Sequence, residues 1–330
     1  MPVSPDDVKS ICAELLKIEV DRIEFPGGNT RDAVRVNIGP LSVIVSKRKS
    51  LQRAQLESTV LRLLNQGGAP VPRLIAYRDH FLIQQDMGSQ RLSERLNASS
   101  ETQVIELLES ALTRLSTIHE IGKANSQFKS VVILGDKAQW LVSLAKSAER
   151  LGVLLGIPAP SLDIDKPVEL LRVDEPTFIK WDARPGNAVL SADGEVNWID
   201  WEHCGRRHPL DDVVWLLADE YTPYLPQEES ALITRVLPMF ANGYSLDQAH
   251  EYLRVFGTFH SCIRIAMILN HQSKGGWWDF QRCLELDRVG VVRELAIQSC
   301  QRAAHWSNHS QLTDSLTPWF GDVLRSIEKR

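Results

Sequence analysis

The hydrophobic pattern of this 330-residue chain changes its period near Gly88, and that change limits the possible fold more than any other feature. Before Gly88, apolar residues alternate with polar ones at 34–38, and a β-branched run follows at 41–47, which together predict a β-hairpin. After Gly88, apolar residues recur at helical spacing, as at 104–118 and 253–268. We therefore expect a small strand-rich part followed by a larger and mostly helical part.

These two parts are expected to form lobes joined by a short connector. We predict a first lobe over 1–84, a connector over 85–90 and a second lobe over 91–330. In the first lobe, a helical pattern at 55–65 ends at Gly67-Gly68 and precedes two short candidate strands. Ligands often bind between two lobes, so the cleft between them is where we expect the chemistry.

The composition argues against several classes of partner. A formal net charge of -5, with no basic cluster interleaved with aromatic residues, argues against a nucleic-acid partner. The chain begins without the pattern of a secretory signal, and its apolar runs are too short to span a bilayer, so no membrane partner is expected. The five cysteines are scattered and never form CxxC, which argues against a disulfide framework and against a zinc site. This use of cysteine suits a reducing compartment, so we expect a cytoplasmic location. No particular oligomeric state is predicted.

The one strand-like part of the second lobe is a polar stretch, FIKWDARPGNAVL followed by SADGEVNWIDWEHCG, at 178–205. It carries Asp182, Asn187 and Asp200, with a Pro-Gly turn between the first two. Such a set could place one carboxylate beside an acceptor hydroxyl, while the amide and the other carboxylate hold Mg2+, which prefers oxygen ligands. Phosphoryl transfer requires little more than this alignment and the neutralisation of charge. The same residue types also make ordinary turns, so a plain surface hairpin is the alternative.

Three segments of this region match the motifs of a known family in the right order. KWDARPGN resembles HGD-L-H-P-G-N, IDWEHCG resembles ID-[WF]-E, and HPLDDVVWL resembles G-D-P-x-x-D of the aminoglycoside phosphotransferase and choline kinase family, whose members are related to protein kinases. The resemblance runs from Phe178 to Leu216. It implies an α+β, bilobal protein-kinase-like fold, with a small β-rich N-terminal lobe that binds nucleotide and a larger, mostly helical C-terminal lobe that binds the acceptor.

The resemblance also implies a reaction and roles for single residues. The γ-phosphoryl group of ATP would move, with Mg2+, to a hydroxyl of a small molecule. Asp182 would be the base that orients this hydroxyl, and Asn187 and Asp200 would hold Mg2+. Arg184 stands where protein kinases have lysine and would stabilise charge on the transferred group, unless it is a surface arginine that bonds loop carbonyls. Asp212 would anchor the loop by hydrogen bonds.

A lysine and a glutamate of the first lobe are expected to hold the donor phosphates. Lys47 ends the run VIVSK in phase with Val43 and Val45, and Glu57 begins the helix ESTVLRLL. This helix and the following GGAPVPRLIAY resemble the family's E-x-x-V-L-x-x-L and G-x-P-V-P-R-V. A solvated strand end and a glutamate that serves the helix macrodipole are the plain alternatives, and Lys49 is the rival lysine.

Two more segments are expected at the nucleotide. Gly27 and Gly28, in PGGNTR, would let backbone N–H groups approach the phosphates, although the full G-x-G-x-x-G pattern is lacking and a simple hairpin turn fits equally well. The connector would contact adenine through its backbone, at Gln85, Asp86 and Met87.

The chain departs from the family pattern directly before Asp182. Lys180 replaces the family's histidine, and Trp181 replaces its glycine. A catalytically inactive nucleotide-binding pseudokinase, with a regulatory or scaffolding role, is therefore the second hypothesis. The presence of Asp182, Asn187 and Asp200 together argues against it, because a protein that only binds needs no base. An unrelated α+β protein without a deep cleft is the third hypothesis.

Several acceptors are compatible with the sequence. Trp277-Trp278 follow a Gly-Gly turn in the region that shapes the acceptor pocket in the family, and aromatic faces bind quaternary ammonium groups. Paired tryptophans also serve packing alone. An amino alcohol, a sugar and an aminoglycoside are all retained as candidate acceptors.

Overall fold

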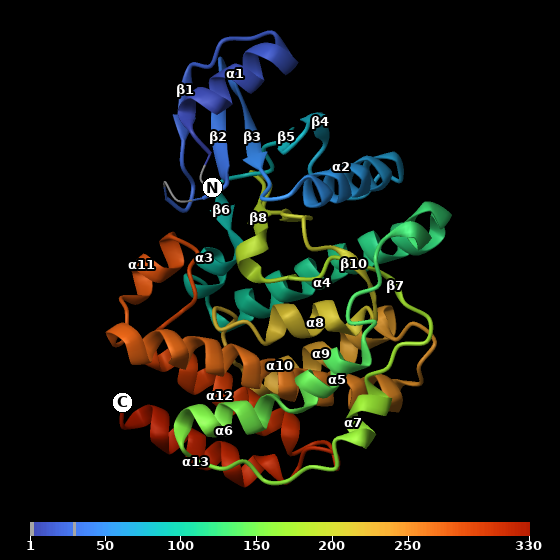
Figure 1. Ribbon diagram of the computed structural model, residues 1–330, viewed down its shortest axis with the longest axis vertical. Helices are drawn as coiled ribbons and strands as arrows, with labels where there is room; N and C mark the ends of the chain where they lie inside the picture. The colour runs from blue at the N-terminus through green and yellow to red at the C-terminus, as the bar shows by residue number, and fades with distance from the viewer. Residues whose placement is uncertain (1–2, 29–30) are drawn as a thin grey trace.

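The computed structural model describes residues 3–28 and 31–330, and it has the expected α+β fold of two lobes. A small strand-rich lobe lies above a larger helical lobe, and the chain passes between them after β5 (Figure 1). The elements of the small lobe are α1 (Pro5–Leu16), β1 (Arg22–Glu24), β2 (Ala33–Ile38), β3 (Leu41–Lys47), α2 (Leu51–Gln66), β4 (Leu74–Arg78) and β5 (Phe81–Gln85).

The large lobe is built mainly from helices, with a few short strands next to the small lobe. Its elements, with η marking 3-10 helices, are β6 (Gln90–Arg91), α3 (Leu92–Asn97), α4 (Glu101–Ala124), η1 (Ser126–Ser130), α5 (Ala138–Ala145), α6 (Ser147–Leu155), α7 (Asp165–Leu170), β7 (Thr177–Ile179), η2 (Pro185–Asn187), β8 (Ala188–Leu190), β9 (Val196–Trp198), β10 (Gly205–Arg207), α8 (Leu210–Leu217), α9 (Pro226–Phe240), α10 (Leu246–Gly275), α11 (Phe280–Glu285), α12 (Arg293–Ser307) and α13 (Leu316–Glu328).

The sheet of the small lobe is antiparallel and has the strand order β1-β2-β3-β5-β4. In the predicted hairpin, Val34 of β2 pairs with Val45 of β3, and Val36 pairs with Val43. These four valines are buried with residues of α1 in a small hydrophobic core. One face of the sheet is therefore covered by α1.

The opposite face of the same sheet looks into the space between the lobes. Arg35, Ile44 and Ser46 alternate with the buried valines and line the interlobe pocket. Because successive side chains of a strand point to opposite faces, the phase of a residue along β3 decides whether it meets α1 or the pocket.

Helix α2 links the small lobe to the main core. Ser50 caps its N-terminus by accepting a hydrogen bond from the backbone N–H of Arg53. Val60, Leu61 and Leu64 are fully buried and belong to the continuous hydrophobic core that also contains the apolar face of α4. The helix thus fixes one side of the small lobe to the large lobe.

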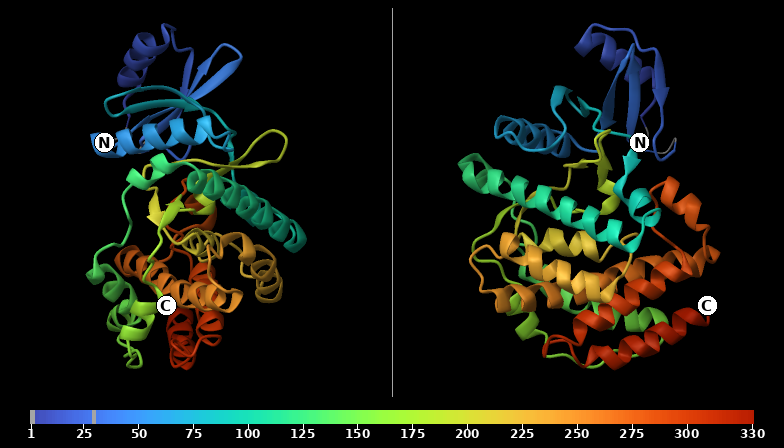
Figure 2. Two further views of the ribbon diagram at one scale, coloured as in Figure 1. Left: turned by 90° about the vertical axis from the view of Figure 1, so that its right-hand side faces the viewer. Right: turned by 180° about the vertical axis from the view of Figure 1, so that it is seen from behind.

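Helix α10 corrects one expectation about apolar runs. By length and composition it could cross a membrane, but 78% of its most apolar window is buried inside the large lobe. Figure 2 shows α10 and α12 side by side within the stack of helices, and α13 lies at the end farthest from the small lobe. Burial of this kind is typical of a core helix.

The polar stretch singled out in the sequence lies on short strands at the top of the large lobe. β8 pairs with β9, and β7 pairs with β10, which confirms the strand-like character of this stretch. Beneath them Trp198 and Trp201 are fully buried, and Trp198 Nε1 donates to the carbonyl of Ala111 in α4. The polar loops therefore rest on a rigid apolar base.

Candidate active site

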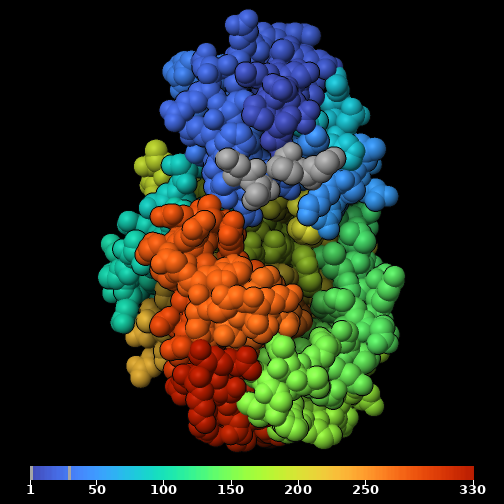
Figure 3. Space-filling view, turned by 60° about the vertical axis from the view of Figure 1, so that its left-hand side comes forward, coloured from blue at the N-terminus to red at the C-terminus, as the bar shows by residue number. Residues whose placement is uncertain are grey.

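A pocket between the lobes is lined by residues from almost every segment predicted to carry chemistry. The sheet, the connector, η2 and the end of β9 all contribute to its walls. Figure 3 shows the hollow below the blue small lobe, between orange and green segments of the large lobe. The deep interlobe cleft argues against the third hypothesis.

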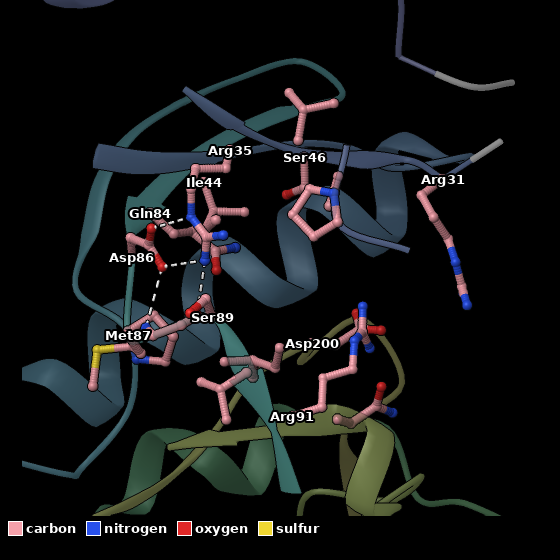
Figure 4. A pocket seen from close by; sticks show the side chains of 18 of the residues that line it. Arg31, Arg35, Ile44, Ser46, Gln84, Asp86, Met87, Ser89, Arg91 and Asp200 are labelled. Atoms are coloured by element: carbon pink, nitrogen blue, oxygen red, sulfur yellow. Dashed lines mark hydrogen bonds and ion pairs between the residues drawn. The ribbon is translucent and has the colours of Figure 1, made fainter. Parts of the chain in front are cut away.

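The connector forms one end of this pocket. Gln85, Asp86 and Met87 line it, and Arg35 of β2 donates to Asp86 through Nε at 2.5 Å and Nη2 at 3.0 Å (Figure 4). Burial alone would raise the pKa of Asp86, but the hydrogen bonds from Arg35 and Ser42 lower it below its usual value. The ion pair between Arg35 and Asp86 thus holds the connector end of the pocket in place.

Gly88 brings the connector close to the large lobe. Its φ of +138° lies in a region that side chains rarely adopt, and a Cβ at this position would collide with the carbonyl oxygen of Leu190. The connector and β8 therefore touch through their backbones.

The polar loop before η2 is held by Asp212, as the resemblance implied. Asp212 Oδ2 accepts from the backbone N–H of Lys180 at 2.7 Å, and Oδ1 accepts from that of Trp181 at 2.7 Å. His119 of α4, which the sequence analysis did not single out, lies with Nε2 2.8 Å from Asp212 Oδ2. These bonds hold Trp181 and Asp182 in the left-handed region, at φ of 52° and 50°.

Asp182 has two side-chain partners in its own loop. Asn187 Nδ2 donates to Asp182 Oδ2 at 2.9 Å and to its carbonyl oxygen at 2.9 Å. Arg184 Nε donates to Asp182 Oδ1 at 3.1 Å. The carboxylate is thereby oriented while 23% of its side chain stays exposed, so a substrate could reach it.

Lys180 takes up a supporting position beneath the loop. Its side chain is fully buried, and Nζ donates to the carbonyl oxygen of Asp200 at 2.8 Å and lies 5.0 Å from the ring centre of Trp201. Burial lowers the pKa of Lys180, and the carboxylate of Asp200 opposes that shift. The residue that replaces the family's histidine thus ties the two halves of the polar stretch together.

Asp200 is the second carboxylate at the pocket wall. Burial would raise its pKa, but Arg48 and Lys180 outweigh burial and lower it below the usual value. Its Oδ1 lies 2.9 Å from Arg48 Nη2, yet the two are not aligned as a hydrogen bond, and this buried oxygen has no hydrogen-bond partner among the residues that the structure describes.

The donor set at this wall suits Mg2+ better than a softer metal. Asn187 uses Nδ2 for Asp182, which leaves its amide oxygen for a cation, and Asp200 offers the buried oxygen described above. Mg2+ takes few protein ligands and completes its shell with phosphate and water. Within 3–28 and 31–330, no group of three or more His, Cys, Asp or Glu side chains could hold a metal, and all five cysteines are free and buried.

The expected ion pair between Lys47 and Glu57 is not formed. Lys47 shares the phase of Val43 and Val45, so it lies on the α1 side of the sheet and its Nζ binds Asp7 Oδ2 at 2.8 Å. The phase that had suggested a role in the cleft is the reason that Lys47 points away from it. Lys49 is exposed and does not take its place.

Arg48, one residue beyond Lys47, occupies the position expected for a lysine. It lines the pocket and donates to Glu57 through Nε at 2.5 Å and Nη2 at 2.8 Å. Glu57 is fully buried and also accepts from Gln84 Nε2 at 3.0 Å. Burial alone would lower the pKa of Arg48, but Glu57 and Asp200 raise it well above its usual value.

The glycine turn of the small lobe is partly described. Gly27 and Gly28 have φ of +81° and +96°, and Pro26 and Arg31 on either side line the pocket. Asn29 and Thr30, in the same predicted segment, lie outside the described residues.

A carboxylate that sequence reasoning missed lies opposite this turn. Asp287, after α11, pairs with Arg31 of the small lobe at 3.2 Å and with Arg91 of the large lobe at 3.0 Å. Arg91 Nη1 also donates to the carbonyl oxygen of Gly186 at 2.8 Å. No motif of the sequence marked Asp287 or Arg91, because their partners are distant along the chain.

Arg184 connects the polar loop to a charged group beneath it. Its Nη1 lies 3.9 Å from Asp219 Oδ2, and Arg264 of α10 pairs with Asp219 at 3.3 Å and with Glu220. Burial and the neighbouring Glu220 raise the pKa of Asp219 to about 7. The loop thus rests on a coupled set of buried charges.

The two tryptophans expected near an acceptor, Trp277 and Trp278, pack against other side chains of the large lobe. Arg293 lies 5.9 Å from the ring centre of Trp277, and Trp278 packs edge-on against His271. Trp181, next to Asp182, packs edge-on against Trp215 at 5.4 Å. Trp277 and Trp278 therefore have packing partners of their own.

Comparisons with known proteins identify the family. The sequence profile of the phosphotransferase enzyme family (APH) matches residues 21–256. No curated protein sequence matches the chain. Among solved structures, choline kinase LicA from Streptococcus pneumoniae aligns over 91% of this chain and 98% of its own, at 17% identity and a TM-score of 0.56, and it has also been solved in complex with AMP.

Two aminoglycoside phosphotransferases align as completely. The gentamicin complex of APH(2")-IIa covers 96% of this chain and 99% of its own, at 15% identity and a TM-score of 0.55, and a streptomycin-ATP ternary complex of that enzyme is also similar. The enzyme from Alicyclobacillus acidocaldarius covers 100% of this chain and 98% of its own, at 9% identity and a TM-score of 0.55. These likenesses show a protein-kinase-like fold, and the profile match covers most of the chain. The chain therefore belongs to the phosphotransferase enzyme family.

Proposed function

We propose that this protein moves the γ-phosphoryl group of ATP, in the presence of Mg2+, to a hydroxyl of a small molecule. The acceptor oxygen forms a bond to the γ-phosphorus, the bond between that phosphorus and the β,γ-bridging oxygen breaks, and ADP leaves. The hydroxyl proton goes to Asp182. One observation carries the proposal: Asn187 and Asp200 line one interlobe pocket, and Asn187 holds Asp182 by a hydrogen bond at 2.9 Å.

The remaining roles follow from contacts on the same walls. Asn187 and Asp200 would hold Mg2+, which supplies charge neutralisation for the donor phosphates. Arg48, held by Glu57, would bind those phosphates in place of the family's lysine, and its planar fork can contact two phosphate oxygens at once. Arg184, beside Asp182, would stabilise charge on the transferred group.

Support for ATP comes from the relatives and from the connector. LicA with AMP and APH(2")-IIa with ATP share this fold. In this chain the base would lie at the connector, against Ile44 of the small lobe and Val189 of the large lobe. Amino alcohols, sugars and aminoglycosides are the acceptor classes to test first.

A screen of phosphate transfer tests the proposal. Mg2+ and ATP are supplied with a panel of amino alcohols, sugars and aminoglycosides, and both ADP and the phosphorylated product are measured. Asp182→Asn should lower the turnover number by about 10²–10⁴-fold, the usual contribution of a general base. The matched control is Asp314→Asn, which changes an exposed aspartate far from the pocket.

Two outcomes would contradict this function. Undiminished transfer by Asp182→Asn would exclude its role as the base. Nucleotide binding without transfer to any acceptor of the panel would favour the pseudokinase hypothesis, which the replacement of a lysine by Arg48 and of a histidine by Lys180 makes worth testing.

A further inference from the structure

Asp287 is bound by one arginine from each lobe. Arg31 reaches it from the end of the glycine turn, and Arg91 reaches it from the start of α3. Arg31 also donates to the carbonyl oxygens of Leu286 and Asp287. Only 5% of the Asp287 side chain is exposed, so this is a desolvated anion between two cations and not a surface ion pair.

The position of Asp287 places it at the catalytic loop. A Cβ at Gly186 would collide with Asp287 Oδ1, and Gly186 lies between Asp182 and Asn187 in the sequence. Asp287, Arg31 and Arg91 line the same pocket as Asn187 and Asp200, and Figure 4 shows Arg31 at the opposite end from Arg35 and Asp86. If the base binds at the connector, the phosphates must extend toward this arginine pair.

The two arginines differ from the other pocket arginines in what holds them. Arg35 and Arg48 each donate two hydrogen bonds to one carboxylate, Asp86 of the connector and Glu57 of α2, whereas Arg31 and Arg91 share Asp287. Arg91 keeps a second anchor, the carbonyl oxygen of Gly186 at 2.8 Å, so its guanidinium would stay in the pocket if Asp287 left. A guanidinium fork donates hydrogen bonds to phosphate oxygens as readily as to carboxylate oxygens.

We propose that Arg31 and Arg91 are a phosphate-binding pair of the donor site, and that Asp287 is an internal anion which occupies the pair until nucleotide displaces it. This inference rests on the proposed function, because it assumes that a nucleoside triphosphate enters this pocket. Such an internal competitor lowers the apparent affinity by the fraction of molecules in which the arginines are free.

Calorimetric titration with two ligands tests this arrangement. The ligands are the magnesium complex of a non-hydrolysable ATP analogue and adenosine, which has the base and ribose but no phosphate. Asp287→Asn removes the competing charge and should tighten binding of the analogue about tenfold, while adenosine affinity stays unchanged. Arg91→Gln should weaken binding of the analogue about tenfold and also leave adenosine unchanged.

The control variant is Asp322→Asn, an exposed aspartate on α13 that should change neither affinity. Melting temperatures show that each variant is folded, and Arg91→Lys provides a second folded variant with the charge kept and the fork lost. If Asp287→Asn binds the analogue no more tightly than the unaltered protein does, Asp287 does not compete with the phosphates. If Arg91→Gln binds the analogue with unchanged affinity, Arg91 does not bind the donor phosphates. If no variant binds either ligand, the proposed function itself fails.

Discussion

The two walls of the pocket are held in place by different means. The lower wall, made of 180–187 and Asp200, is fixed largely through the backbone: Asp212 accepts from two main-chain N–H groups, and Lys180 donates to a main-chain carbonyl. The upper wall, made of Arg31, Arg35 and Arg48, consists of side chains, each paired with a carboxylate, and Arg31 and Arg35 also donate to main-chain carbonyls.

This difference has consequences for how the two walls respond to ligands. A loop held by main-chain hydrogen bonds has one arrangement, because the bonded groups have no other partners when buried. An arginine held by a carboxylate can exchange it for another anion of suitable geometry. Under the proposed function, the lower wall would align the reacting atoms, and Arg31 of the upper wall would exchange Asp287 for phosphate.

The largest expected effect tests the rigidity of the lower wall. Asp212→Ala leaves two buried main-chain N–H groups and His119 without their acceptor, so the free energy of unfolding should fall by about 3–5 kcal/mol. Chemical denaturation measures this loss, with the exposed Asp314→Ala as control. A loss no larger than that of the control would mean that the wall does not depend on this anchor.

A smaller loss is expected when the upper wall loses its central cation. Arg48→Met leaves Glu57 buried without its ion pair, which should lower the free energy of unfolding by about 3 kcal/mol, since Gln84 still donates to the carboxylate. Arg48→Lys should recover part of this stability and retain nucleotide binding, because one charged hydrogen bond remains. The exposed Arg62→Met on α2 is the matched control. Loss of binding by Arg48→Lys alone would show that the fork is essential.

The smallest effect concerns the charges beneath the lower wall and depends on pH. Because burial raises the pKa of Asp219 from 3.8 to about 7, the folded protein keeps a proton there that the unfolded chain has lost in this interval. Stability should therefore fall as pH rises from 3.8 to about 7 and then level off.

Asp219→Asn isolates this contribution. Relative to the variant, the unaltered protein should lose unfolding free energy over that interval, measured by denaturation at several pH values. A difference that stays constant with pH would mean that Asp219 is ionised throughout and that Arg184 and Arg264 neutralise it fully.

The lower wall could be predicted well from the sequence. Asp182, Asn187 and Asp200 lie in short loops whose ends are set by the pairings of β7, β8 and β9, so spacing along the chain translates into spacing in the structure. The hydrogen bonds of Asp212 followed from the same ordered motifs. His119 had no such signal, because α4 precedes the loop by many residues.

The upper wall could not be predicted as well, and β3 shows why. A shift of one residue, from Lys47 to Arg48, moves a side chain from the α1 face to the pocket. The alternation at 43–47 was visible, but the face covered by α1 was not, since both faces of this strand carry buried residues. Asp287 meets Arg31 only after some 250 intervening residues have folded, and no local pattern announces such a contact.

Because Gly88 has no side chain, the connector can approach the main chain of β8 directly. Since the connector lies directly on the carbonyl of Leu190, the two lobes meet there with nothing between their main chains. If the base binds at the connector as proposed, this contact would limit the distance between the two lobes on either side of the base. A larger residue at Gly88 would push the connector away from β8, and the base would then be held less tightly between the two lobes.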